Sequence, residues 1–393
     1  MLIKGRHNCD AVVNPRESKQ QELAAVSGLQ TLVIDCGWVG CGDISSDHSR
    51  SRMKIGNLMS KALMHFALFA FALSSSGVAA ELITLKLAYF SSDRDPAYAS
   101  VVKPFADAVN KDAKGTLEIL AYPGGVLGRA YGLQAQLVLH GTADMAWVNP
   151  SLTPQLFTDG AVMQLPGLFR DLKEATMAHT AIMSTGTLRD YEKFYVIGSF
   201  ANYPLMIHTR SPVATLADLR GKKLRANNLT EVKTLEALGI ESVVLPINEI
   251  ALAISRGTID GTTMPPGSLF DYGISRMTKY HYVGSLGAAP LNFLMNRERF
   301  ESLPTAGQDA IRRYSGNWSA AQFIESFDAR NDSAMAQLRS DPMRKVIVPS
   351  SADLEAAHVV FKAVIDAWAT KSPRNSELLN LAETEIAKLR ATR

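Results

Sequence analysis

Short strand-like segments alternate with helical segments of about ten residues, and this alternation limits the possible folds more than any other feature of the chain. Residues 81–90, 116–121 and 144–148 have the apolar alternation or short apolar runs typical of strands, and residues 97–111 and 129–140 between them have helical patterns. Strands separated by single helices usually pair in parallel. The pattern therefore predicts an α/β fold built from βαβ units.

The same order recurs in the second half of the chain, which predicts a second α/β unit. From Met295 onward the pattern becomes mostly helical. The further helices are expected over residues 171–184, 229–238, 247–256, 305–338, 351–370 and 376–392, and the further strands near residues 194–200, 204–208, 222–226, 242–245, 259–263 and 345–349.

A short repeat relates the two units. Both LHGTADMAWV and ISRGTIDGTTM pass from a helix end through Gly-Thr-x-Asp into a strand. Gly141 and Gly257 suit the left-handed position that follows a helix, and Asp144 and Asp260 begin the next strands. This shared layout predicts two related domains that face each other across a cleft.

The pattern of an export signal begins inside the chain, at Met53. A positively charged start is followed by the apolar run ALMHFALFAFAL at residues 62–73 and by small residues ending at Ala80. The run is shorter than the roughly 20 residues that span a bilayer, which argues against a permanent anchor, and its flanks argue against a core helix. We expect a signal peptide over residues 53–80, a periplasmic mature chain, and an upstream extension over residues 1–52 outside the functional protein.

The composition excludes several classes of protein. All three cysteines, Cys9, Cys36 and Cys41, precede Met53, so the expected mature chain has no disulfide, no cysteine nucleophile and no thiolate metal site. Residues 81–393 contain 33 basic and 32 acidic side chains. This balance predicts neither a nucleic-acid interface nor a polybasic membrane patch.

Arg225 is the leading candidate for a ligand contact. It lies at the end of the expected strand 222–226 and is followed by Asn227 and Asn228. A guanidinium matches a carboxylate in two parallel charge-assisted hydrogen bonds, and open α/β sheets bind ligands at strand ends. A basic surface edge is an equal alternative for Arg225. The two asparagines either bond to the same carboxylate or only form the turn.

Other candidates lie at or just past expected strand ends, although a large aromatic such as Trp147 is more often part of the core. Asp93-x-Asp95 is interpreted as a turn rather than as part of a calcium loop. The motifs of serine hydrolases, zinc proteases, dinucleotide-binding proteins and phosphate loops do not occur in residues 81–393, so we expect no catalytic residue, metal or cofactor. The candidates are Phe90, Asp93, Trp147, Asn149, Tyr203, Met264 and Asn292.

Six segments are together specific for one family. In chain order they are AYPGGVLG (121–128), LHGTADMAWV (139–148), LPGLFRD (165–171), LADLRGKKLRA (216–226), LPINEIALAISRGTIDG (245–261) and NRERFESLP (296–304). From Leu82 onward the chain resembles the substrate-binding subunit of TRAP transporters, the tripartite ATP-independent periplasmic carriers (solute-binding protein family 7).

The resemblance implies a two-domain type II periplasmic binding protein fold with a ligand cleft between the domains and a helical C-terminal region. We expect the first domain over residues 81–200, the second over 201–300, and bracing helices over 301–393, and the return of C-terminal segments to the first domain is left open. The resemblance also implies capture of a small organic acid and its delivery to the small and large TRAP permease subunits. Arg225 fills the position of the family arginine that pairs with the ligand carboxylate.

Compared with sialic-acid-binding members of the family, this chain has less polar residues at four candidate positions, namely Phe90, Asn149, Tyr203 and Met264. A sugar acid needs many hydrogen bonds, and each unpaired buried hydroxyl costs about 1 to 3 kcal/mol. We therefore expect a monocarboxylate with an aromatic or branched apolar body. The expected contacts are Arg225, Phe90, Trp147, Asn149, Tyr203, Asn227, Met264 and Asn292.

Two other functions are compatible with the same pattern. A sensory binding protein would present the ligand to a membrane receptor or kinase, and neighbouring permease genes would distinguish transport from sensing. A secreted α/β enzyme is disfavoured by the missing catalytic motifs.

Overall fold

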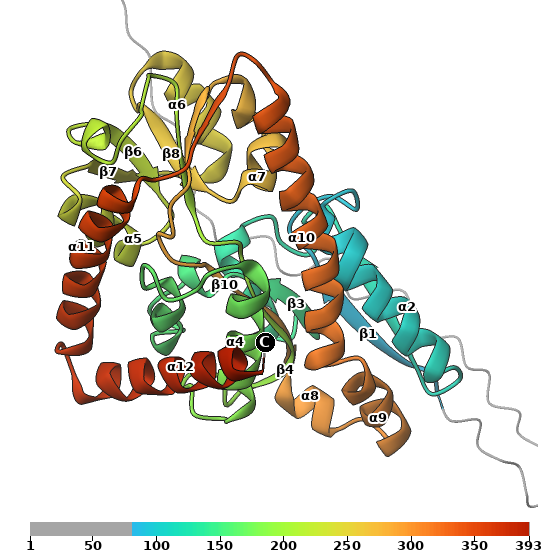
Figure 1. Ribbon diagram of the computed structural model, residues 1–393. Coiled ribbons are helices and arrows are strands. Elements are labelled where there is room, and N and C mark those ends of the chain that lie inside the picture. The colour runs from blue at the N-terminus through green and yellow to red at the C-terminus, as the bar shows by residue number, and fades with distance from the viewer. Residues whose placement is uncertain (1–80, 393) are drawn as a thin grey trace, which may run out of the picture. The chain divides into compact units, whose positions relative to one another are not determined.

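The computed structural model describes residues 81–392, which form two β-sheets and the helices that cover them (Figure 1). The expected upstream extension, the expected signal peptide and the three cysteines lie outside the described residues. Within residues 81–392, every helix is too short or too polar to cross a membrane.

The first sheet has the strand order β2-β1-β3-β10-β4. β1 pairs in parallel with β2 and β3, as expected for βαβ units, whereas β10 lies antiparallel between β3 and β4. The strands are β1 Ile83–Ala88, β2 Leu117–Tyr122, β3 Met145–Val148, β4 Phe194–Ala201 and β10 Pro290–Asn296.

The second sheet has the strand order β11-β9-β5-β8-β6-β7. β6 pairs in parallel with β7 and β8, β9 pairs in parallel with β11, and β5 lies antiparallel between β8 and β9. The strands are β5 Met206–Thr209, β6 Lys223–Ala226, β7 Glu241–Val244, β8 Gly261–Met264, β9 Tyr280–Tyr282 and β11 Lys345–Ile347.

Helices follow most strands and also form the C-terminal part of the chain. The α-helices are α2 Lys103–Asp112, α3 Gln134–Leu139, α4 Leu172–Ser184, α5 Leu229–Ala237, α6 Ile250–Arg256, α7 Pro266–Asp271, α8 Arg297–Glu301, α9 Thr305–Arg313, α10 Asn317–Ser340, α11 Ser351–Ala369 and α12 Pro373–Ala391. A π-helical turn, Tyr98–Val102, precedes α2, and short 3-10 turns occur at Tyr131–Leu133, Pro150–Leu152, Asp159–Gln164, Ala217–Leu219, Ile247–Glu249 and Ile274–Arg276.

The structure differs from the sequence expectations chiefly in the antiparallel strands. β9 and β10 were not expected, and β10 pairs with the first sheet although it lies within residues 201–300, which were assigned to the second domain. β11 likewise joins the second sheet from within residues 301–393. The expected long helix 305–338 is divided into α9 and α10 at Gly316, whose φ of 61° is incompatible with a continuous helix.

The Gly-Thr-x-Asp repeat has the same structure in both sheets. Gly141 and Gly257 have φ angles of 71° and 72°. The backbone N–H of Lys86 on β1 donates to the Asp144 carboxylate at 2.6 Å, and the backbone N–H of Lys223 on β6 donates to the Asp260 carboxylate at 2.9 Å. Each aspartate N–H bonds in turn to the carbonyl of that lysine. The repeat therefore fixes the central strands of both sheets in the same way.

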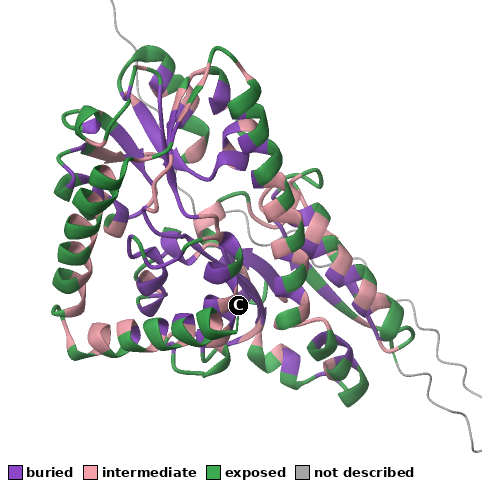
Figure 2. Ribbon diagram, in the orientation of Figure 1, coloured by how far each residue is buried: buried purple, intermediate pink, exposed green. Residues whose placement is uncertain are grey.

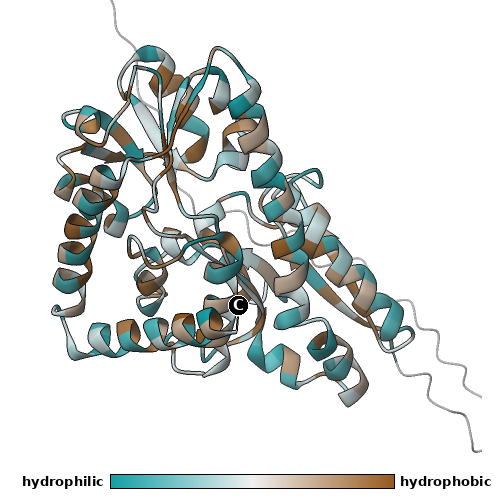
Figure 3. Cartoon of the chain, in the orientation of Figure 1, coloured by the Kyte–Doolittle hydropathy of each residue, from teal (hydrophilic) through white to brown (hydrophobic). Residues whose placement is uncertain are grey.

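Each sheet is covered on two faces by separate apolar clusters. On the first sheet, Leu87 and Ala88 belong to different clusters, as alternation along a strand requires. The second sheet also separates two clusters, one around Leu224 and one around Met206. Figure 2 shows that the strands of both sheets are mostly buried, whereas the outer faces of the helices are exposed, and Figure 3 shows apolar as well as polar residues on those helices.

Two long helices pack against clusters of both sheets. α10 contributes Phe323 to the first sheet and Leu338 to the second. α11 packs Phe361 against the second sheet and Trp368 against the first. The C-terminal region therefore braces both sheets.

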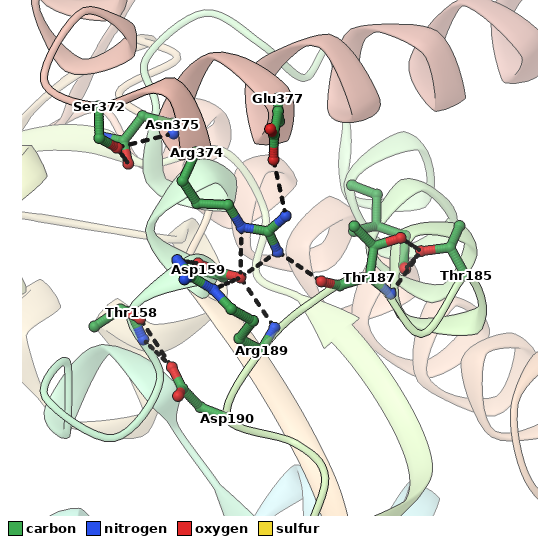
Figure 4. Close-up of polar contacts among 11 residues, drawn as sticks. Thr158, Asp159, Thr185, Thr187, Arg189, Asp190, Ser372, Arg374, Asn375 and Glu377 are labelled. Carbon is green, nitrogen blue, oxygen red and sulfur yellow. Dashed lines mark hydrogen bonds and ion pairs between the residues drawn. The ribbon is translucent and has the colours of Figure 1, made fainter.

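A buried carboxylate, Asp159, anchors α12 to the turn Asp159–Gln164, which α12 contacts together with α4 (Figure 4). Asp159 is only 2% exposed and accepts hydrogen bonds from Arg374 Nη2 at 2.5 Å and from the Arg189 backbone N–H at 2.9 Å. Arg374 also donates to the Thr187 carbonyl at 2.6 Å. Burial opposes ionisation of Asp159, but the hydrogen bonds from Arg374 and Arg189 outweigh it and lower its pKa.

Candidate ligand-binding cleft

A cavity of about 670 Å³ lies between strand ends of the two sheets. Residues following β1 and β3 line it from the first sheet, and residues of β6 and β8 and the loop after β7 line it from the second. Its polar and charged lining residues are Asp95, Arg129, Asn149, Asn202, Arg225, Asn227, Asn248, Ser268 and Asp271, and its aromatic ones are Tyr89, Phe90, Tyr131, Trp147, Tyr272 and Phe327.

Arg225 is the buried cation of the cavity. It is 5% exposed, and its Nε donates to the Leu245 carbonyl at 3.0 Å. No other hydrogen bond of this side chain is present within residues 81–392. Burial lowers the pKa of Arg225 from its usual value, but an arginine keeps its charge in proteins. Because Nε is occupied, a ligand carboxylate would approach the two terminal nitrogens end-on.

A buried acid, Glu231, is linked to the backbone around Arg225. Glu231 is completely buried and accepts the backbone N–H of Asn227 at 2.8 Å. The hydroxyl of Thr263 on β8 is hydrogen-bonded to the Glu231 carboxyl and lies 3.2 Å from the Arg225 carbonyl oxygen. Burial raises the pKa of Glu231 to about 7, against smaller opposing effects of the Asn227 N–H and the Arg225 charge.

The raised pKa of Glu231 makes its protonated form accessible near neutral pH, and that form would satisfy this geometry. A hydroxyl has only one proton to donate. If Glu231 were ionised, Thr263 could donate either to the carboxylate or to the Arg225 carbonyl. A neutral Glu231 would instead donate to the Thr263 oxygen and leave the threonine proton for the Arg225 carbonyl, so that every group is satisfied.

Aromatic rings form the wall contributed by the first sheet. Phe90 stacks on Tyr131 with ring centroids 3.7 Å apart and planes 7° apart. Trp147 is 2% exposed and stacks on Phe200 at 5.0 Å, so it belongs to the core while also lining the cavity. Met264 contributes an apolar side chain from the second sheet.

Six of the eight residues expected at the site line the cavity together: Phe90, Trp147, Asn149, Arg225, Asn227 and Met264. Asn149 caps the turn Pro150–Leu152, because its side chain accepts the Ser151 N–H at 2.9 Å. The backbone N–H of Asn227 donates to the Glu231 carboxyl.

Asn292 and Tyr203 do not line the cavity. Asn292 is fully buried in β10, where its amide oxygen accepts from the Tyr191 hydroxyl at 3.1 Å and its amide nitrogen lies 3.3 Å from Ser199 Oγ. Tyr203 packs against the apolar cluster of the first sheet. Both expectations assumed a strand end facing the cleft, whereas Asn292 lies inside a strand that sequence periodicity did not indicate.

Asp95, Arg129, Tyr131 and Tyr272 line the cavity but were not expected to. Asp95 was interpreted as a turn residue only. None of the four lies at an expected strand end, so the rule that found Arg225 could not identify them. Within residues 81–392 there is no group of three or more histidine, cysteine or acidic residues that could hold a metal.

The model of bacterial extracellular solute-binding protein family 7 matches residues 87–371. The chain belongs to this family. It is a TRAP-type substrate-binding protein, from a class of transport proteins rather than enzymes. Both the two-domain periplasmic binding protein fold and the helical C-terminal region expected from the sequence are confirmed.

Several family members with known structures or names are similar over most of the chain. A marine metagenome TRAP solute-binding protein specific for aromatic acid ligands, solved with metahydroxyphenylacetate, is 26% identical with a TM-score of 0.71, covering 78% of this chain and 99% of that one. A *Rhodoferax ferrireducens* TRAP protein with copurified benzoate is 24% identical with a TM-score of 0.70, covering 79% and 99%. The 2,3-diketo-L-gulonate-binding periplasmic protein YiaO of *Escherichia coli* is 24% identical, covering 79% and 94%.

Proposed function

We propose that this protein captures a small carboxylate with an aromatic or branched apolar body and delivers it to a TRAP membrane permease. The observation behind the proposal is Arg225. It is a buried cation at the cavity wall whose Nε is fixed by Leu245 and whose terminal nitrogens have no hydrogen bond within residues 81–392. Such a guanidinium is oriented in advance to bind a carboxylate with two hydrogen bonds.

The walls favour an apolar ligand body. Phe90 and Met264 offer no hydrogen bonds to a row of sugar hydroxyls, and Trp147 offers at most one donor. The similar marine protein is specific for aromatic acids, which supports the same ligand class here. The name of the *E. coli* relative indicates a sugar acid, so sugar acids are the informative competitors.

A thermal-shift screen of purified residues 81–393 tests the ligand class. The screen compares benzoate, phenylacetate and mandelate with glucuronate and 2,3-diketogulonate. A ligand at 100 times its Kd stabilises the protein by about 2.7 kcal/mol, which gives a clear increase in Tm. We expect increases with the aromatic acids only. A response to sugar acids alone would contradict the apolar part of the proposal.

Arg225→Ala and Arg225→Lys test the carboxylate contact. We expect at least about a hundredfold loss of affinity with alanine and only partial recovery with lysine, which cannot form the paired hydrogen bonds. Arg256→Ala, at an exposed position on α6, is the matched control and should bind as the wild type does. Undiminished binding by Arg225→Ala would refute the contact.

Export and delivery need cellular tests. The homologues are periplasmic binding proteins, and we propose the same location for this chain, with cleavage after Ala80. Sequencing the N-terminus of the periplasmic protein should give Glu81 as the first residue. Uptake of the labelled acid should disappear when the gene is deleted and return with the wild type but not with Arg225→Ala. Uptake that is independent of the gene, with sensing lost instead, would favour the sensory alternative.

A further inference from the structure

Asp95 places a second charged group in the cavity that contains Arg225. It precedes the turn Tyr98–Val102 and lines the cavity beside the aromatic wall. Its Oδ1 accepts hydrogen bonds from the Tyr89 hydroxyl at 2.6 Å and from the Ala97 N–H at 3.0 Å. Its Oδ2 has no hydrogen bond within residues 81–392.

The two oxygens of Asp95 therefore differ in role. Oδ1 accepts hydrogen bonds from the turn and from the buried Tyr89 hydroxyl, and these two contacts explain why a residue with an acceptor oxygen is needed at position 95. They do not explain why that residue is an aspartate, since the side-chain oxygen of an asparagine would accept the same two hydrogen bonds. Within residues 81–392 Asp95 also forms no ion pair, although its charge acts on Arg330, which is itself paired with Asp271.

Asp95 and Arg225 act on the same part of the cavity. Tyr272 also lines this cavity, and its pKa is raised to about 12, first by burial and then by the charge of Asp95, while the charge of Arg225 lowers it, so both charges reach this residue. A ligand bound at Arg225 therefore meets a cation at one point and an unpaired anion at another. The carboxylate of such a ligand is repelled by Asp95, so the group that faces Asp95 has to be a hydrogen-bond donor.

We infer that Asp95 is a specificity-determining residue that selects carboxylates bearing a hydrogen-bond donor, a hydroxyl or an ammonium group, on the apolar body. The inference rests on the proposed binding of a carboxylate at Arg225 and specifies the ligand further. A site that presents an acceptor without a protein hydrogen bond disfavours analogues that lack the donor, because the bound ligand displaces water from the acceptor and gives it no new partner.

Matched ligand pairs test the inference in the wild-type protein. Isothermal titration at pH 7.5 compares benzoate with 3-hydroxybenzoate and 3-(aminomethyl)benzoate, and phenylacetate with 3-hydroxyphenylacetate. We expect at least one donor-bearing acid to bind about tenfold or more tightly than its parent. The hydroxyl and ammonium compounds show which donor Asp95 accepts. Parents that bind as tightly as all their donor-bearing partners would overturn the inference.

Asp95→Asn tests the residue itself. This variant keeps an oxygen for Tyr89 and Ala97 but replaces the free oxygen with an amide donor. We expect the preference for donor-bearing acids to fall to about twofold or less while the parent acids bind as in the wild type. Asp93→Asn, at an exposed position that does not line the cavity although the sequence suggested it as a candidate, is the control and should keep the wild-type preference. An unchanged Tm without ligand shows that the variant is folded.

The outcomes separate this inference from the proposed function. If parent acids bind and Arg225→Ala abolishes binding, but Asp95→Asn keeps the wild-type preference, the carboxylate site stands and the role of Asp95 is refuted. If no acid in the panel binds the wild-type protein, both proposals fail.

Discussion

The starts of α4 and α5 have the same local architecture but opposite electrostatics. Each begins with a side chain that caps the N–H of a glutamate three residues later, Asp171 for Glu174 at 2.7 Å and Asn228 for Glu231 at 2.9 Å. Each glutamate is fully buried and accepts the N–H of the residue before the cap, at 3.1 Å in α4 and 2.8 Å in α5.

The partners of the two glutamates make the difference. Glu174 accepts hydrogen bonds from Arg390 on α12 at 2.6 Å and from Arg170 at 2.8 Å. Burial opposes its ionisation, but these arginines outweigh burial and lower its pKa. Glu231 has the Asn227 N–H and Thr263 as partners, and its pKa is raised to about 7. One motif therefore holds the C-terminal helix α12 through Arg390, while the other places an acid with a raised pKa near Arg225 in the cavity wall.

The largest expected effect concerns the pH dependence caused by Glu231. Its folded pKa of about 7 exceeds the ordinary 4.5, so the unfolded chain loses this proton first and stability decreases as pH rises between these values. The shift corresponds to about 3 kcal/mol. Urea unfolding at pH 5 and pH 8 should show this decrease in the wild type and a much smaller one in Glu231→Gln. Equal pH dependence in both proteins would refute a neutral Glu231.

Glu174→Gln should destabilise the protein at neutral pH, because Glu174 is ionised and paired there. Removing a carboxylate that is paired with two partly exposed arginines should destabilise the protein by about 2 kcal/mol. Because the folded pKa is lowered, the loss should be constant between pH 6 and 8 and should shrink only below the ordinary pKa of a glutamate. Urea unfolding of this variant, measured alongside Glu231→Gln, gives the comparison. If Glu174→Gln instead stabilised the protein at pH 8, the Glu174 carboxylate would not be stabilised by its arginines, and the proposed difference between Glu174 and Glu231 would be wrong.

The Gly-Thr-x-Asp repeat should give the smallest effects. Asp144→Asn and Asp260→Asn each weaken one charge-assisted bond to a strand N–H, so we expect losses of about 1 kcal/mol each. Asp144 also pairs with the partly exposed Arg299 at 3.2 Å, which should make its loss slightly larger. Thermal unfolding of both variants measures this difference. A large loss of stability in only one of the two variants would show that the two copies of the repeat have the same structure but stabilise their sheets unequally.

The sequence predicted those features that depend on local pattern. The alternation of strands and helices located most elements, and the combination of residue type and strand end identified Arg225. β10 was missed because its pairing with β3 and β4 joins residues that are far apart in the sequence, such as Pro290 with Ala201 and Asn292 with Val148, and no local periodicity indicates such pairing. Asn292 was therefore assigned to the cleft, although it hydrogen-bonds inside the first sheet.

The charges and hydrogen bonds around the cavity could not be predicted from local sequence patterns either. Glu231 was recognised only as part of an expected helix, and its burial depends on Thr263 from a strand about thirty residues later. Asp95 matched the pattern of a turn, and only the structure showed that it also lines the cavity and that its hydrogen bonds within residues 81–392 involve Oδ1 alone.

The two bracing helices also determine how the protein loses its structure. Unfolding the second sheet would remove the partners of Leu338 on α10 and Phe361 on α11, while the other ends of these helices still pack on the first sheet. A state with only one folded sheet would expose apolar surface on both helices and gain little chain entropy, because the chain passes between the sheets several times. The two sheets are therefore expected to melt in one calorimetric transition, and stability measured anywhere in residues 81–392 is a property of both.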